Sequence, residues 1–142
     1  MSTKEISAWV MVIGAVVITA WVFWDASTHG LAADSSAAAW KMLCAILYAI
    51  GFNIVVVIIG VILVSIAQRE EVKDERADER DHMINGRSMG NAYVTLSVGV
   101  LGVLIWLAFG LEAHLVSYAL FGISMLAGVA FATTQIVLYR RS

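Results

Sequence analysis

Four long apolar stretches divide the chain, and short polar segments separate them. The stretches run from about residue 6 to 24, 40 to 67, 92 to 109 and 116 to 139. A helix needs about 20 mostly apolar residues to cross a bilayer, and each stretch is close to that length. The pattern therefore predicts an all-α membrane protein, a four-helix transmembrane bundle in which the whole chain forms one domain.

Composition supports the same class of protein. The 142 residues are 61% hydrophobic and 14% charged, whereas a soluble domain is about half apolar and about a quarter charged. The formal net charge of −2 argues against nucleic acid as a partner, because that requires a basic surface. The one cysteine, Cys44, cannot form a disulfide within the chain.

Lysine and arginine predict the orientation, because short cytosolic loops are enriched in these residues. Only Lys41 lies in the segments that would face outward. The other eight lie in the middle loop and near the two termini: Lys4, Arg69, Lys73, Arg76, Arg80, Arg87, Arg140 and Arg141. We therefore expect a multi-pass protein whose termini and charged middle loop are cytosolic.

The middle loop contains the sequence DERADERD at residues 74–81, and we expect a separate cytosolic helix over residues 68–84. At 100° per residue its cations fall on one side and its acids cover the rest. We expect a bend near Gln68, turns at Gly86 and Gly90, and a helix lying along the inner membrane surface. The residues assigned to this interaction helix are Arg69, Lys73, Asp74, Arg76, Asp78, Glu79, Arg80 and Asp81.

Three interpretations are compatible with this charge pattern, two with a partner and one without. The basic side suits anionic lipid headgroups, which attract each nearby cation by about 1 kcal/mol. The acidic side suits a cytosolic protein partner. The third interpretation is a solvated linker helix that binds nothing specific.

The run DERDHMINGRSMGNAY, residues 78–93, resembles a pattern in small bacterial four-span membrane proteins of unknown function. In that pattern Asp-Glu-Arg-Glu is followed by Ile, a basic residue, a small residue and Ala at the start of a span. The matching residues here are Asp78, Glu79, Arg80, Asp81, Ile84, Arg87, Ser88 and Ala92, with Asp81 in place of the usual Glu. The resemblance implies a bacterial inner-membrane location, with genes often neighbouring small transcriptional regulators, and it implies no known activity.

Polar residues at the predicted outer face are candidate metal ligands. Asp25 and His29 are four residues apart and would share a helix face, and Glu112 and His114 are two apart. Carboxylate and imidazole groups suit a divalent cation or a proton. Neither an HExxH motif nor a pair of CxxC motifs is present in the sequence.

The two halves of the chain align as a repeated helical hairpin. An offset of 85 residues aligns Gly14 with Gly99, Trp21 with Trp106 and His29 with His114. The second and fourth stretches align less cleanly: Tyr48 and Ala49 align with Tyr118 and Ala119 at an offset of 70, and after one inserted residue Gly51 aligns with Gly122 and Arg69 with Arg140 at an offset of 71. Such a duplication would place the two histidines at equivalent positions, as a shared metal or haem requires.

Within the spans the polar residues favour helix packing. We expect Asn53 to hydrogen-bond to a neighbouring helix. Ser124, Gly128 and Ala132 recur every four residues and form a face of small side chains, which allows close approach of a helix in the bundle or in a second copy. We expect a homodimer.

No nucleophile–base pair, phosphate-binding loop or zinc spacing appears in the sequence. We therefore expect a non-enzymatic regulatory or binding protein that acts through its cytosolic charged helix, and no motif names a cofactor. The alternative is a small carrier or a metal- or haem-binding protein, with a site at the outer ends of the first and third spans.

Overall fold

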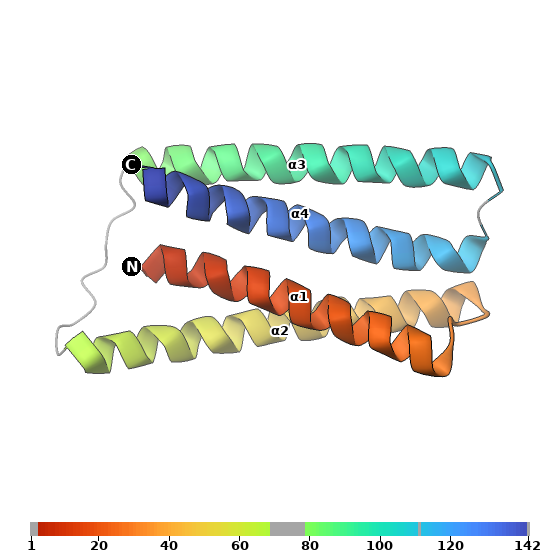
Figure 1. Ribbon diagram of the computed structural model, residues 1–142, viewed down its shortest axis with the longest axis horizontal. Coiled ribbons are helices and arrows are strands. Elements are labelled where there is room, and N and C mark those ends of the chain that lie inside the picture. Colours follow the sequence, from red (N-terminus) through yellow and green to blue (C-terminus); the bar gives the residue numbers. More distant parts are fainter. Residues whose placement is uncertain (1–2, 69–78, 111, 142) are drawn as a thin grey trace.

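The computed structural model describes residues 3–68, 79–110 and 112–141 (Figure 1). These residues form four helices: α1 (Thr3–His29), α2 (Ser35–Gln68), α3 (Glu79–Ala108) and α4 (Ala113–Arg141). All four are long and apolar enough to cross a membrane. The predicted all-α class and the four spans are confirmed, and the protein is a multi-pass membrane protein.

All four helices run roughly along one direction, and this gives the molecule two distinct ends (Figure 1). The start of α1, the end of α2, the start of α3 and the end of α4 share one end, which we call the charged end. The α1–α2 and α3–α4 connections lie at the other end, which we call the loop end.

Two glycines end the helices at the loop end. Gly30 follows α1 with a φ of 77°, and Gly110 follows α3 with a φ of 98°. A residue in this left-handed region stops a helix and lets its last carbonyls find donors, and only glycine adopts it without steric cost. At the end of α3, for example, the Gly110 N–H donates to the Leu107 carbonyl over 3.0 Å.

Asp34 caps the start of α2. Its backbone carbonyl accepts from the Ala38 N–H over 3.0 Å, and its carboxylate accepts from the Ser36 hydroxyl over 2.5 Å. The Ser36 hydroxyl, together with backbone N–H groups of Ser35, Ser36 and Ala37, holds the pKa of the Asp34 carboxyl below its ordinary value of 3.8. A capping side chain of this kind satisfies N–H groups that have no partner within the helix.

The helix that contains the third predicted span begins before that span does. We expected the span to start at Ala92, but α3 starts at Glu79 and runs without interruption through Gly86 and Gly90. The turns predicted at these two glycines are therefore wrong. Glycine weakens a helix by only about 1 kcal/mol, and burial of Ile84 in this segment offsets that cost.

The separate cytosolic helix predicted over residues 68–84 is corrected in the part that the structure describes. Residues 79–84 form the first turns of α3 rather than a helix of their own. Residues 69–78, which carry most of the predicted helix and include Arg69, Lys73, Asp74, Arg76 and Asp78, lie outside the described residues.

Helix α4 is the centre of the bundle. It contacts α1, α2 and α3, and α1 also contacts α2. Among the described residues, α3 contacts only α4, and α2 and α3 do not contact each other. Figure 1 shows α3 along one edge of the molecule and α2 along the other.

The core has two parts along α4. Val22, Met42, Ala45 and Phe121 form one cluster, where α1, α2 and α4 meet. The second cluster lies nearer the charged end, where Ala8 of α1 packs against Ala132 and Ile136 of α4. Small side chains at these contacts let the helices approach closely, which is how helices associate in a membrane.

Two glycines mark the closest approaches between neighbouring helices. A Cβ atom at Gly99 would lie 2.5 Å from the Ile123 side chain of α4. A Cβ atom at Gly14 would lie 3.0 Å from the Asn53 side chain and 3.3 Å from the Phe52 side chain of α2. Each hairpin, α1–α2 and α3–α4, therefore has one glycine at the place where its two helices approach most closely.

Gly99→Ala is expected to destabilise the protein by about 1–3 kcal/mol, the usual cost of overpacking. The added methyl group would lie 2.5 Å from Cγ2 and 2.8 Å from Cγ1 of Ile123, so the Ile123 side chain or the helices must shift. Gly102→Ala is the matched control, because a Cβ atom there meets nothing within 4 Å. Thermal unfolding in lipid bicelles measures both.

Shortening the facing side chain provides a second test of the same contact. Ile123→Ala in the Gly99→Ala background should recover part of the lost stability, because it removes the atoms that overlap. Equal stability of the Gly99→Ala and Gly102→Ala variants would contradict the close α3–α4 approach.

Candidate functional site

At the charged end, two side-chain contacts tie α4 to its neighbours. The Tyr139 hydroxyl donates to Asp81 Oδ1 of α3 over 3.0 Å. The Arg140 guanidinium lies 5.7 Å from the centre of the Trp9 ring of α1, within the range of a cation–π interaction. The charged end is therefore an ordered assembly of α1, α3 and α4.

The residues that resemble the bacterial pattern divide into two groups on α3. Asp81, Ile84, Ser88 and Ala92 are three or four residues apart and share one helix face. Ile84 and Ser88 are buried, Ala92 is half-buried, and Asp81 bonds α4. Half of the pattern thus has a structural explanation, the packing of α3 against α4.

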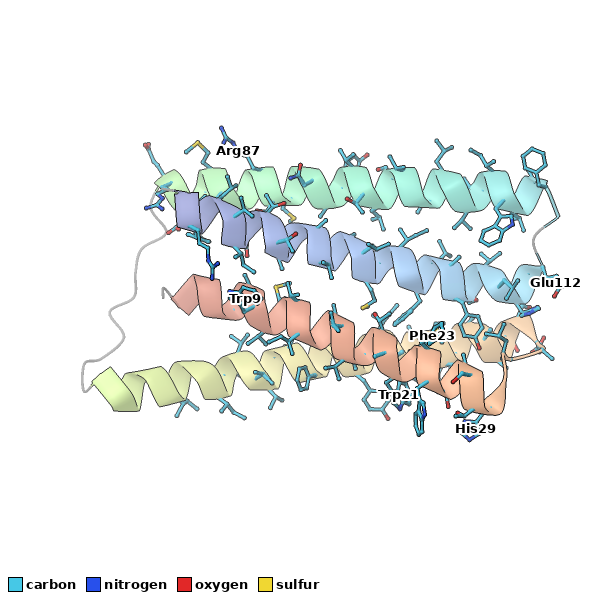
Figure 2. The ribbon with its side chains drawn as sticks, viewed as in Figure 1. Trp9, Trp21, Phe23, His29, Arg87 and Glu112 are labelled. Atoms are coloured by element: carbon cyan, nitrogen blue, oxygen red, sulfur yellow. The ribbon has the colours of Figure 1, made fainter. Side chains whose placement is uncertain are left out.

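The second group of the pattern is exposed. Glu79, Arg80 and Arg87 all have exposed side chains, and Figure 2 shows Arg87 pointing away from the rest of the bundle. Glu79 and Arg80 also take part in interactions of their own, and Arg87 is an exposed charge on the same side of the charged end.

A charge network joins α1 to α2 at the loop end. The Lys41 ammonium contacts Asp25 Oδ2, and His29 Nδ1 lies 3.2 Å from Asp25 Oδ1. The Asp25 side chain is only 18% exposed, so its charge is paired where water is scarce. In the sequence, Lys41 stands out only as the single lysine or arginine in the segments predicted to face outward. The available clue was that this single cation shares the loop end with several acids.

Helix α4 is also tied to the loop end. The Tyr118 hydroxyl accepts a hydrogen bond from the Ala32 N–H in the α1–α2 connection over 3.1 Å. Its ring packs against the cluster around Phe121. Tyr118 of α4 therefore also fixes the connection between the first two helices.

The four candidate metal ligands form two separate pairs. Asp25 pairs with His29, and Glu112 Oε2 lies 3.4 Å from His114 Nδ1. In the part of the chain that the structure describes, no group of three or more His, Cys, Asp or Glu side chains is arranged to hold a metal ion. His29 and Glu112 lie apart at the loop end (Figure 2), so the geometry gives the shared metal or haem no support.

Asn53 bonds its own helix rather than a neighbouring one. Its Nδ2 donates to the Ala49 carbonyl over 2.8 Å, and the side chain lies over Gly14 of α1. Its Oδ1 is buried and has no hydrogen-bond partner among the described residues. Asn53 contributes to the α1–α2 contact by its position there, and the predicted bond between helices is not formed by its amide nitrogen.

The small-residue face of α4 is used only in part inside the bundle. Ala132 is buried against α1. The Ser124 hydroxyl donates to the Leu120 carbonyl of its own helix over 2.8 Å, and a Cβ atom at Gly128 would meet nothing within 4 Å among the described residues. The close contact predicted for this face is thus made at Ala132, with α1 of the same chain.

The fold and composition define the class, a four-span membrane protein whose charged end is its most densely polar described region. Comparisons with protein-family models, with curated proteins and with solved structures find no match. Function therefore has to be argued from the geometry of this chain.

Tyr139→Phe removes the hydrogen bond between the last turns of α4 and the first turn of α3. We expect a loss of about 1 kcal/mol, typical of a hydrogen bond between membrane helices, and faster hydrogen exchange over residues 79–84. Tyr93→Phe is the control, because Tyr93 is exposed on α3. Unchanged exchange in Tyr139→Phe would show that this bond does not hold the start of α3.

Proposed function

We propose that this protein is a non-enzymatic regulatory or binding protein of the bacterial inner membrane, and that it acts through its charged end. The observation that carries the proposal is the continuity of α3. One helix runs from Glu79 and Arg80 in the charged sequence to Ala108 at the loop end. A partner that binds the charged sequence therefore acts directly on a membrane span.

The packing of α3 makes that coupling effective. Among the described residues α3 contacts only α4, and Asp81 fixes its first turn to Tyr139. A force on the exposed charges near Asp81 is opposed by one helix–helix contact rather than by several. Within the described chain, displacement of α3 thus involves one helix neighbour, whereas displacement of α1 involves two and displacement of α4 involves three.

Length supports an aqueous location for this region. Helix α2 has 34 residues and α3 has 30, which correspond to about 51 Å and about 45 Å of helix. A bilayer core is about 30 Å thick. Both helices therefore extend past the hydrocarbon, and the exposed Glu79, Arg80 and His82 mark α3 as protruding at the charged end.

The partner that we favour is the anionic lipid surface. The sequence supplies Arg69, Lys73, Arg76 and Arg80 at spacings of three and four residues, and each cation near such a surface contributes about 1 kcal/mol. The resemblance of residues 78–93 to small bacterial membrane proteins supports the inner-membrane location. Cytosolic placement of this end follows from the excess of lysine and arginine there.

Cysteine labelling tests the orientation. In a Cys44→Ala background, single cysteines at Ser2, Ala77 and Ser142 should react with an impermeant maleimide only after the cells are opened. Phe109→Cys, at the loop end and exposed, is the control that should react in intact cells. Labelling of Ala77→Cys from outside intact cells would reverse the orientation.

Charge removal tests the lipid partner. Replacing Arg69, Lys73, Arg76 and Arg80 with Gln should accelerate hydrogen exchange over residues 70–82 in vesicles of anionic lipid at low salt, because the attraction to headgroups is lost. Replacing Asp74 and Asp78 with Asn should change exchange much less. Asp81 stays unchanged in both variants, because it bonds Tyr139.

The ranking of the two variants separates the partners. Faster exchange in the Asn variant than in the Gln variant would indicate a protein bound through the acids and would contradict the lipid proposal. Equal and negligible changes would indicate a solvated linker. Vesicles of zwitterionic lipid are the control, and in them the Gln variant and the wild type should exchange alike.

A further inference from the structure

The uncharged part of α2 is longer than that of its neighbour α1. Asp25 of α1 and Lys41 of α2 contact each other, so both helices start from the same level at the loop end. From that level α1 has 19 uncharged residues, 6–24, and α2 has 26 uncharged residues, 42–67. At 1.5 Å per residue these stretches are about 28 Å and about 39 Å long. The stretch in α2 is therefore about 10 Å longer.

A bilayer core of about 30 Å matches α1 but not α2. A stretch of about 39 Å fits this core only at a tilt of about 40°, the upper limit for membrane helices, whose average tilt is about 20°. A helix that is too long for the core must tilt or bend, or the bilayer must thicken around it. In a core that suits α1, α2 therefore has to depart from the direction of α1.

Only one half of α2 has the freedom to do so. The buried side chains of α2 all lie in the half nearer the loop end, and they are Ala38, Met42, Ala45 and Ala49. Beyond Asn53, which lies against Gly14 of α1, no described side chain of α2 is buried. We call residues 54–68 the free half of α2. Figure 1 shows this half diverging from α4 towards the charged end.

The boundary between the two halves is a place where a helix bends easily. A Cβ atom at Gly51 would meet nothing within 4 Å, so no neighbour packs against the backbone there. Two residues later, the Asn53 side chain donates to the Ala49 carbonyl of the preceding turn. Helices bend at glycine and where a side chain joins the backbone hydrogen bonds. Residues 51–53 therefore suit a pivot.

We propose that α2 adapts the protein to bilayer thickness, and that its free half pivots at residues 51–53. In a thin bilayer the free half tilts further away from α4, and in a thick bilayer it tilts less. The other half stays fixed, because its side chains are buried against α1 and α4. Arg69 follows the free half directly in the sequence, so the pivot carries bilayer thickness to the start of the charged sequence. The proposal is independent of the partner that the charged end binds.

Distances between pairs of spin labels, measured by pulsed electron paramagnetic resonance, test the pivot. In a Cys44→Ala background, Ile59→Cys and Val137→Cys report the separation of α2 and α4 at the charged end, and both side chains are exposed (50% and 45%). Residue 59 lies about 9 Å beyond Asn53 along the helix. A change of about 20° in tilt, well within the range of membrane helices, therefore moves it by about 3 Å.

The labelled protein is measured in vesicles of short-, medium- and long-chain phosphatidylcholine. The distance between the labels at 59 and 137 should be about 3 Å longer in the short-chain than in the long-chain vesicles. The control pair is Leu43→Cys with Leu120→Cys, which lies at the loop end and is also exposed, and its distance should stay constant. An unchanged 59–137 distance in all three lipids contradicts the pivot. Equal changes in both pairs show that the whole bundle loosens, and they also overturn the proposal.

Ile62→Lys tests whether apolar length drives the change. The lysine shortens the uncharged stretch of α2 to residues 42–61, about 30 Å, which matches the bilayer core. Ile62 is 51% exposed, so the substitution displaces no buried side chain. The dependence of the 59–137 distance on lipid chain length should fall to less than half in Ile62→Lys and persist in the matched control Ile62→Leu. Equal dependence in the two variants would show that the length of α2 is not the cause, and the proposal would be wrong.

Discussion

The bundle depends on how closely α4 approaches its neighbours, because lipid gives its helices no hydrophobic reason to associate. What remains is packing and a few polar contacts, and α4 provides both. Ala132 meets Ala8 of α1 in a buried cluster, and Ile123 fills the space left by Gly99 of α3. Polar contacts of α4 include the bond of Tyr118 to the α1–α2 connection, the bond of Tyr139 to Asp81, and the bond between Asn91 Nδ2 and Thr134 Oγ1 along the α3–α4 contact. Without α4, α3 would have no partner in the described chain.

The spans could be predicted from the sequence because hydropathy measures transfer into lipid, which each helix undergoes separately. Helix limits were harder to predict. Gly86 and Gly90 suggest turns, yet both lie inside α3, because the same segment buries Ile84 and Ser88 against α4 and holds the helix together. The sequence alone shows the cost of a glycine and not the packing that offsets it. Gly30 and Gly110, by contrast, do end helices, because both adopt the left-handed conformation that stops a helix.

The candidate sites were harder to predict than the spans, since each depends on which residues meet in space. Aligning His29 with His114 suggested equivalent positions, but His29 ends α1 and His114 lies in the first turn of α4. Lys41 seemed an isolated outward charge, while the structure pairs it with Asp25. Asn53 seemed to bridge two helices, but its amide bonds the Ala49 carbonyl of its own helix. In each case the residue type indicated that the side chain would make a polar contact, but the sequence did not predict which residue it would contact.

The charged sequence and the bundle are linked through the first two turns of α3. On one face of these turns, Ile84 and Ser88 are buried against α4, and Asp81 bonds Tyr139. On the other side, Glu79, Arg80 and Arg87 are exposed. A single helix thus has charged side chains on its exposed side and buried side chains that pack against α4 on its other side. Because helix is stiff over a few turns, a change on the exposed side moves the buried side as well. Among the described helices, the one that carries this link also has the fewest neighbours, so its position is decided by α4 and by whatever covers its open face.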